Sequence, residues 1–386
     1  MKTIRILIIN PWSGVVGPNV GLLQLVKEGV KRNHRMHVLF PVKDEMFENA
    51  ETLGAKAHLD NGLALTPREI GPKSATGHSK LAYQQLKISL SAIKKVRPNV
   101  ICINAENMLF APLAAKICKI PFVIYVRGAR FVELKHIGKL YFGIQKIFNP
   151  RYIAVSNYVS IGLRKMGVSE RAINIIPNGV DLDVFRPIPK EKTLIKELGI
   201  PINHSIIGAI CHLTPRKGIH HILEIMKLLM KRVPRISCIV VGKENEKHYK
   251  YLLEKKIKEY NLADRIKLLG ERQDVSRIIS CLDVLVHPSE TESFGRTIAE
   301  SMAMGKPVVG FDIDAVPELV THGVTGYIAE PFNYDEICRY TEKLLRDNEL
   351  KKRMGLNGLE KAKVEYDVNK NIGKTIDLLE MLSKQS

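Results

Sequence analysis

The chain has 386 residues, which is too long for one ordinary domain and suits two domains of roughly 150 to 200 residues each. Hydrophobic residues make up 45% of it and charged residues 26%, so the composition excludes a disordered chain and predicts a packed α/β protein. No apolar stretch reaches the ~18 residues that a membrane span needs.

The positive charge is unevenly spread. The net charge is +19, and residues 1–186 carry 27 Lys and Arg against 12 Asp and Glu, or +15. This excess predicts a polyanionic partner, such as an anionic membrane surface or a phosphate-bearing acceptor, although a Lys-rich soluble surface would also produce it. Nucleic acid is disfavoured, because no nucleic-acid motif or array of base-stacking aromatics is present.

The first ten residues contain a short apolar run that ends at Asn10 and Pro11 without a cleavage-like site. This pattern favours a first β-strand over a signal peptide. The six cysteines form no CxxC pair and mostly lie in apolar segments, so we expect reduced, buried thiols in a cytoplasmic protein. They are Cys102, Cys118, Cys211, Cys238, Cys281 and Cys338.

Short β-branched runs alternate with longer amphipathic stretches, as in parallel strands joined by helices. We expect strands near 4–9, 37–40, 100–103, 122–126, 152–155 and 174–176, then 205–211, 237–241, 266–269, 284–287, 307–310 and 326–328. Two prolines within Phe185–Lys190 predict an extended linker. The expected domains are 1–186 and 187–367, with residues 368–386 as a helix that packs back on the first domain.

Residues 282–328 carry the most specific pattern. A buried strand stops at Pro288 and Ser289, a loop follows, and a helix begins near Arg296. The amides of about Phe294–Arg296 then lie at a helix N-terminus, where Gly295 lets a phosphate approach the backbone. Glu292 precedes this helix and Glu300 lies about two turns inside it, so two carboxylates can contact one elongated ligand.

This segment closely resembles the family 4 glycosyltransferases, whose E-x7-E signature is matched by Glu292 and Glu300. Further blocks of the family match in order along the chain, strongly in the C-terminal half and weakly in residues 1–140. They are Val155-Ser156, Ile176–Asp181, Lys217-Gly218, Val241-Gly242, Gly270 and Gly323–Tyr327. The resemblance implies a GT-B fold, in which two Rossmann-like domains face each other across a cleft and the second domain holds the donor.

The resemblance also implies a role for each matching residue. Lys217 and Arg216 would neutralise the donor diphosphate, Glu300 would hold the ribose hydroxyls, and Glu292 would stabilise positive charge on the transferred sugar. The remaining implied donor contacts are Phe294, Gly295 and Arg296 at the helix, Gly242, Arg272 and Gln273 around the base, and Gly14 and Gly17 in the first domain.

Two departures from the family pattern affect the expected chemistry. Cys211-His212 stands where the family usually has Gly-Arg, so Arg216 is expected to replace the missing arginine. Arg127-Gly128, followed by Arg130, stands where the family often has a histidine. These acceptor-side arginines can bind an anion but cannot act as a general base, so we expect the leaving diphosphate to deprotonate the acceptor, with retention.

Three weaker patterns concern possible metal sites and a possible membrane-binding helix. We expect no metal at Asp312 and Asp314, although they resemble a DxD motif, and none at His220-His221, which has no second ligand at useful spacing. Residues 135–148 carry Lys135, Lys139 and Lys146 among apolar side chains. They form either a helix on an anionic membrane or an ordinary core-facing helix.

The sequence therefore predicts a metal-independent, cofactor-free, retaining hexosyltransferase. It would use a nucleotide-diphosphate sugar and a lipid-linked or cell-surface glycan acceptor, in the cytoplasm or on the inner face of the membrane. Two alternatives are a soluble transferase with a small sugar-phosphate acceptor and a nucleotide-sugar 2-epimerase of the same fold. The E-x7-E pattern argues against the epimerase.

Overall fold

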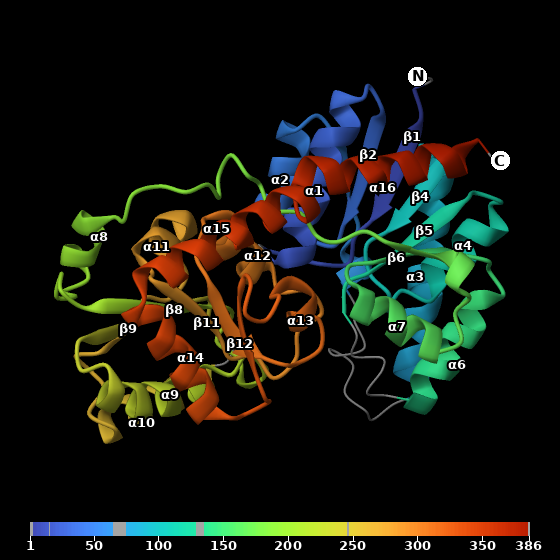
Figure 1. The fold of residues 1–386 in the computed structure, drawn as a ribbon. Coiled ribbons are helices and arrows are strands. Elements are labelled where there is room, and N and C mark those ends of the chain that lie inside the picture. The colour runs from blue at the N-terminus through green and yellow to red at the C-terminus, as the bar shows by residue number, and fades with distance from the viewer. Residues whose placement is uncertain (1–2, 15, 65–74, 129–134, 245–246, 385–386) are drawn as a thin grey trace. The chain divides into compact units, whose positions relative to one another are not determined.

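The computed structural model describes residues 3–14, 16–64, 75–128, 135–244 and 247–384. The chain divides into two compact units (Figure 1), unit 1 with residues 1–179 and 368–386 and unit 2 with residues 180–367. The division falls at Gly179, earlier than the boundary expected at Arg186. Residues 185–190, the expected linker, contain no helix or strand and belong to unit 2.

Unit 1 is built on a parallel sheet with the order β3-β2-β1-β4-β5-β6-β7. Its strands are β1 Arg5–Ile9, β2 Arg35–Phe40, β3 Lys56–Leu59, β4 Val100–Ile103, β5 Phe122–Val126, β6 Arg151–Ala154 and β7 Ile173–Ile175. Its helices are α1 Gly17–Lys31, α2 Glu45–Thr52, α3 Ala75–Val96, α4 Phe110–Ile117, α6 Lys135–Lys146, α7 Asn157–Lys165 and α16 Val368–Ser383, with short 3-10 turns at Asn61–Ala64 and Glu170–Ala172. Strands β1, β4 and β5 are almost wholly buried, as in a sheet covered on both faces.

Unit 2 repeats the scheme with the order β10-β9-β8-β11-β12-β13, again parallel. Its strands are β8 Ser205–Ile210, β9 Ile236–Val241, β10 Ile266–Leu268, β11 Val284–His287, β12 Val308–Phe311 and β13 Gly326–Ala329. Its helices are α8 Lys192–Glu197, α9 Ile219–Arg232, α10 Lys247–Glu259, α11 Val275–Cys281, α12 Arg296–Ala303, α13 Val316–Leu319, α14 Tyr334–Arg346 and α15 Asn348–Glu365, with a 3-10 turn at Pro215–Lys217.

The C-terminal helix returns to unit 1, as the sequence predicts. In Figure 1, α16 (red) lies beside α1 (blue), with Ile372, Ile376, Leu379 and Leu382 buried. Two polar contacts fasten it at its C-terminal half: Arg32 Nη1 to Asp377 Oδ1 at 2.6 Å, and His34 Nε2 to Glu380 Oε1 at 2.8 Å.

The chain passes between the units at two points that lie side by side. A Cβ on Gly179 would meet the Cα of Val368 at 2.2 Å, so only glycine fits there. One residue further, Val180 pairs with Asp367, and its N–H donates to the Tyr366 carbonyl at 2.7 Å. A close backbone approach and a β-bridge thus hold the two crossing segments against each other.

All six cysteines are free, as expected; four are buried, whereas Cys118 and Cys211 are partly exposed. Burial raises the pKa of the Cys102, Cys211, Cys238 and Cys338 thiols to about 12. A thiol with such a pKa stays protonated at neutral pH and is a poor nucleophile.

Candidate functional site

The strand order of unit 2 reverses between β8 and β11, which are neighbours in the sheet. Ligands of open parallel sheets bind at such a switch point, outside the carboxyl ends of the strands. The loop after β8 carries Lys217, and the loop after β11 carries Glu292. The topology therefore places Lys217 and Glu292, two of the three residues predicted to be catalytic, at the same edge of the sheet; the third, Arg216, lies next to Lys217.

Lys217 and Glu292 form a largely buried ion pair between Nζ and Oε2, with both side chains 13% exposed. His287, the last residue of β11, places Nε2 3.3 Å from the same carboxylate oxygen. Burial alone would raise the pKa of Glu292, but the charge and hydrogen bond of Lys217, together with the neighbouring His287 imidazole, outweigh it and hold that pKa far below its usual range. Glu292 is therefore ionised at neutral pH. Sequence reasoning missed His287, since it reads as an ordinary strand residue.

Asp314 holds the loop on which Glu292 lies. Its Oδ2 accepts hydrogen bonds from Thr291 Oγ1 at 2.7 Å and from the Glu292 N–H at 2.9 Å. The Ala315 N–H in turn donates to the Glu292 carbonyl at 3.1 Å. Asp314 adopts φ 52°, a left-handed conformation that Asp and Asn tolerate better than most residues. The structure therefore gives Asp314 a positioning role.

Replacing Asp314 is expected to loosen this loop. Asp314→Ala removes the acceptor of two hydrogen bonds, and we expect it to lower the free energy of unfolding by about 1 to 3 kcal/mol. Asp314→Asn keeps an acceptor oxygen and tolerates the same backbone conformation, so it is the matched control and loses less. Urea unfolding of both variants measures the difference, and equal losses would remove this role.

Helix α12 begins where the sequence predicts. Gly295, with φ 94°, is its N-cap, and Arg296 is its first residue. Phe294 is buried and packs its ring against Tyr366, edge to face, at 5.6 Å. The positive end of the helix dipole therefore lies beside Glu292, where anions are favoured.

Glu300 lies within α12 and is 9% exposed. Burial raises the pKa of its carboxyl to about 7, although the charge of Arg296 opposes the shift. At neutral pH, Glu300 is therefore about half protonated, whereas Glu292 on the same segment is ionised. Two neighbouring carboxyls whose pKa values are shifted in opposite directions are typical of a functional site, although ion-pair networks also produce them.

The loops after β8, β9 and β10 lie against one another. The Gly242 N–H donates to the Gly270 carbonyl at 2.8 Å, and a Cβ on Gly242 would meet the Cys211 carbonyl oxygen at 1.7 Å, so this approach requires glycine. Arg272 pairs with Asp274 at 2.7 Å, and Gln273 is exposed. The residues predicted to surround the base are thus on adjacent loops.

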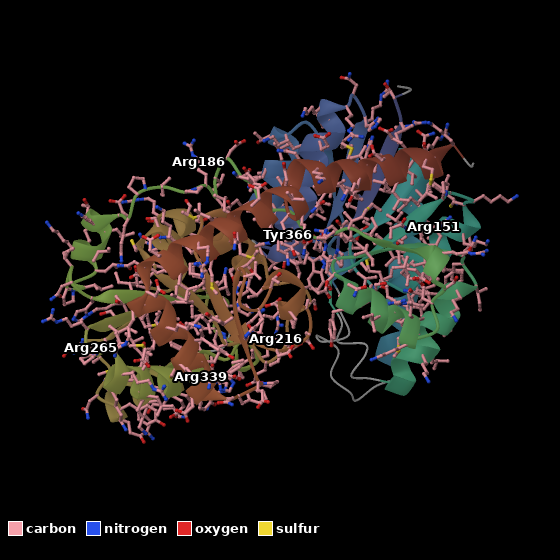
Figure 2. The ribbon with its side chains drawn as sticks, viewed as in Figure 1. Arg151, Arg186, Arg216, Arg265, Arg339 and Tyr366 are labelled. Atoms are coloured by element: carbon pink, nitrogen blue, oxygen red, sulfur yellow. The ribbon has the colours of Figure 1, made fainter. Side chains whose placement is uncertain are left out.

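Arg216 and His212 differ in the charge they can supply. Arg216, labelled in Figure 2, is exposed on the 3-10 turn that also carries Lys217. Burial, with the charges of Lys217 and Arg216, lowers the pKa of His212, so His212 is neutral at pH 7. Arg216 is therefore the better candidate to replace the family arginine.

The predicted acceptor-side residues lie in unit 1. Arg127 follows β5 and donates from Nη2 and Nε to Asn104 Oδ1 at 2.7 and 2.9 Å, and from Nη1 to Asn178 Oδ1 at 3.2 Å. The guanidinium also lies over the Tyr125 ring at 3.9 Å. Amide oxygens and a ring face thus hold this cation at the carboxyl edge of the sheet. Arg130 lies outside the described residues.

Gly14 and Gly17 flank the start of α1. Gly14 has φ 68°, and its N–H donates to Asp44 Oδ2 at 2.7 Å. A Cβ on either glycine would meet no atom within 4 Å. Their role in donor binding stays a prediction.

A carboxylate lies beside His220 and His221, although their spacing in the sequence suggests no further metal ligand. Glu290, from the loop after β11, reaches both imidazoles. Sequence spacing could not reveal this neighbour, because Glu290 is 69 positions from His221 and only the fold brings them together. Among the described residues, these three side chains form the one group that could hold a metal ion.

No helix in the described part of the chain has the length and apolar character needed to cross a membrane.

Comparisons with known proteins cover both units. The family model described as Glycosyltransferase Family 4 matches residues 15–184, and that described as Glycosyl transferases group 1 matches residues 190–361. The chain is 27% identical over 302 residues to UDP-Gal:alpha-D-GlcNAc-diphosphoundecaprenol alpha-1,3-galactosyltransferase of Escherichia coli, covering 74% of this chain and 76% of that one.

Two further matches differ in extent. Identity to N-acetyl-alpha-D-glucosaminyl L-malate synthase of Bacillus anthracis is 24% over 234 residues, which is 60% of this chain and only 59% of that enzyme. The crystal structure of Anabaena HepE with UDP and glucose superposes with a TM-score of 0.82 at 22% identity, covering 98% of this chain and 100% of HepE. That likeness concerns the fold alone. With both units matched, the chain belongs to the family 4, group 1 glycosyltransferases and has their GT-B fold.

Proposed function

We propose that this glycosyltransferase moves a hexose-type sugar, with retention, from a nucleotide-diphosphate sugar to a lipid-linked or cell-surface glycan acceptor. The buried cluster of Lys217, Glu292 and His287 at the switch point of unit 2 carries the proposal. It combines a cation for a diphosphate with an ionised carboxylate for a sugar. The UDP-Gal donor and diphosphoundecaprenol-linked acceptor named for the Escherichia coli relative are consistent with it.

The donor would lie along the loops of unit 2. Lys217, Arg216 and the N-terminus of α12 would neutralise the diphosphate, Glu300 would accept from the ribose hydroxyls, and the Gly242 loop would contact the base. A lysine acts as a point charge and an arginine adds paired hydrogen bonds. When the bond from the anomeric carbon to the diphosphate breaks, Glu292 would stabilise positive charge on the sugar.

The proton of the acceptor hydroxyl would go to the leaving diphosphate. In this step the bond from the anomeric carbon to the phosphate oxygen breaks, the bond to the acceptor oxygen forms on the same face, and a diphosphate oxygen takes the proton. Arginine at position 127 cannot remove a proton at neutral pH, which favours this route. Proton NMR of the product tests it: an α-linked donor should give an α-linked product, and a β-linked product would exclude retention.

A small anionic acceptor is the second candidate. The excess positive charge of residues 1–186 suits a phosphate or carboxylate as well as a lipid diphosphate, and the Bacillus anthracis relative is named for L-malate. Transfer to an undecaprenyl-diphosphate sugar, compared with transfer to a free sugar phosphate, separates the two candidates. Transfer only to the free acceptor would favour the second.

We expect transfer to proceed without a divalent ion at the diphosphate. Lys217, Arg216 and the dipole of α12 supply the positive charge that a metal otherwise provides. Initial rates with and without EDTA, after exhaustive dialysis, measure the dependence. A rate lost with EDTA and restored by Mn²⁺, but not by Zn²⁺, would show that the diphosphate needs a metal.

Helix α6 gives the proposed membrane contact a structural basis. Leu140 is 68% exposed and Ile147, just beyond the helix, 72%. Lys139 and Lys146 are also exposed. Each lysine is followed by an exposed apolar residue, and the two pairs lie seven positions apart. Such pairs suit the headgroup region of an anionic bilayer.

Reversing these two lysines should weaken vesicle binding. Each basic side chain near an anionic surface contributes about 1 kcal/mol, so Lys139→Glu with Lys146→Glu should lower the partition coefficient by ~30-fold or more. The control Lys94→Glu with Lys95→Glu makes the same charge change on α3. Co-sedimentation with phosphatidylserine vesicles at low salt measures both. An equal loss of vesicle binding in both double variants would assign the binding to net charge alone. If the wild-type protein does not bind the vesicles, a soluble acceptor is favoured.

A further inference from the structure

A cluster of two imidazoles and one carboxylate lies beside the donor loops. His220 and His221 are in the first turn of α9, and Glu290 is in the loop after β11. Glu290 Oε1 lies 3.3 Å from His220 Nε2 and 3.2 Å from His221 Nε2. All three ligand atoms lie within 4.8 Å of one another.

These separations suit a tetrahedral ion. Zinc binds histidine nitrogen at about 2.0 to 2.1 Å and carboxylate oxygen at about 2.0 to 2.2 Å, so its ligand atoms stand roughly 3.3 to 3.5 Å apart. Both measured nitrogen to oxygen distances are close to this range. Two imidazoles disfavour Mg²⁺ and Ca²⁺, which take oxygen ligands.

The other nitrogen of each imidazole already has a partner. His220 Nδ1 lies 2.9 Å from the Tyr249 hydroxyl, and His221 Nδ1 lies 2.7 Å from the Tyr334 hydroxyl. With Nδ1–H donating to a tyrosine oxygen, each Nε2 presents its lone pair towards Glu290. Histidine ligands of metals are oriented in this way by a second hydrogen bond.

The ring of His221 is also fixed by packing. Its side chain is 7% exposed and lies against the rings of Phe311 and Phe332 at 5.8 and 5.3 Å. The His220 and Glu290 side chains are 31% and 37% exposed, which leaves solvent access for a water as fourth ligand. One ligand is thus rigid, and an ion can enter from the opposite side.

We propose that His220, His221 and Glu290 bind one zinc ion, with water as the fourth ligand. The ion would join the start of α9 to the loop that carries Glu292. The Glu290 N–H already donates to the Arg216 carbonyl at 2.9 Å, next to Lys217. The site therefore stabilises the loops that carry the Lys217 and Glu292 pair and takes no part in neutralising the diphosphate.

Calorimetry on the tag-free full chain, stripped with EDTA and dialysed, tests the proposal with ZnCl₂ as titrant. We expect one zinc per chain and a rise in Tm on binding. Glu290→Gln and His220→Gln keep the size of the side chain and should weaken zinc binding by about 100-fold or more. Tyr249→Phe should weaken it by about 10- to 100-fold, since that residue acts through His220. His248→Gln, an exposed histidine on α10, is the control and should bind zinc as the wild type does.

Absence of zinc binding by the wild type, or unchanged affinity in both Glu290→Gln and His220→Gln, would overturn the proposal. An equal loss in His248→Gln would assign binding to surface histidines and overturn it as well. The cobalt(II) form adds a readout independent of transfer, since a tetrahedral site gives intense visible absorption, which Glu290→Gln should lose. The outcome is separable from sugar transfer, because zinc can bind whether or not transfer needs a metal.

Discussion

Lys217→Ala should lower kcat/KM by about 10²-fold, the equivalent of about 3 kcal/mol of transition-state stabilisation. The substitution removes the buried cation that would lie opposite the leaving diphosphate, where charge develops as the glycosidic bond breaks. Because that charge is larger in the transition state than in the bound donor, we expect both kcat and donor binding to fall. Steady-state kinetics at saturating acceptor measure the two effects.

The same substitution leaves Glu292 buried without its ion-pair partner, which is itself destabilising by about 3 to 5 kcal/mol. A second variant separates folding from catalysis. Lys217→Met with Glu292→Gln removes both charges at similar volume and should recover much of the stability while transfer stays low. A Lys217→Ala enzyme that folds and keeps its turnover would contradict the role given to this residue.

Glu300→Gln should stabilise the ligand-free protein at high pH and much less at low pH. The folded-state pKa of Glu300 is raised from 4.5 to about 7, so between these values the folded chain keeps a proton that the unfolded chain releases. Stability therefore falls as pH rises through this window, by about 3 kcal/mol in all. Glutamine does not ionise, so the variant does not lose stability in this way as pH rises. The stability difference between variant and wild type should grow by about 2 to 3 kcal/mol from pH 5 to pH 8.

Urea unfolding at several pH values measures this difference, with Glu360→Gln on the exposed face of α15 as the control. A difference independent of pH would mean that Glu300 ionises normally in the folded chain. Glu300→Gln should weaken donor binding even though it stabilises the ligand-free protein, since an amide replaces the carboxylate proposed to accept hydrogen bonds from the ribose hydroxyls. Calorimetry with the donor should find weaker binding than in the wild type at pH 8.

The sequence predicted the sheets well because most strands are continuous buried runs. Of the thirteen strands in the described part of the chain, twelve were expected within a few residues. The exception, β3, reads Lys-Ala-His-Leu and has no buried residue, since it lies at the edge of the described sheet, beside β2. An edge strand with exposed side chains has neither the apolar run nor the alternation that marks a strand.

The site was predicted where chemistry follows one continuous segment and missed where it depends on contacts between segments. Glu292, Gly295 and Glu300 lie on a single strand, loop and helix, so their relation could be anticipated. Asp314 acts on Glu292 from the turn after β12 and His287 from the end of β11, and no spacing rule joins them to it. We expected the domain boundary at the prolines of the linker, whereas the compact units divide after Gly179, beside a residue, Val368, that is distant in the sequence.

The central claim is that unit 2 binds a nucleotide-diphosphate sugar through the Lys217 and Glu292 loops. Thermal unfolding with a panel of UDP-, GDP-, ADP- and TDP-sugars tests it most directly. At about 100 times its dissociation constant, the correct donor should add about 2.7 kcal/mol to the free energy of unfolding, and Arg216→Ala should reduce that gain at the same concentration. A panel in which no nucleotide sugar stabilises the wild type, or in which one stabilises Arg216→Ala and the wild type equally, would contradict the account.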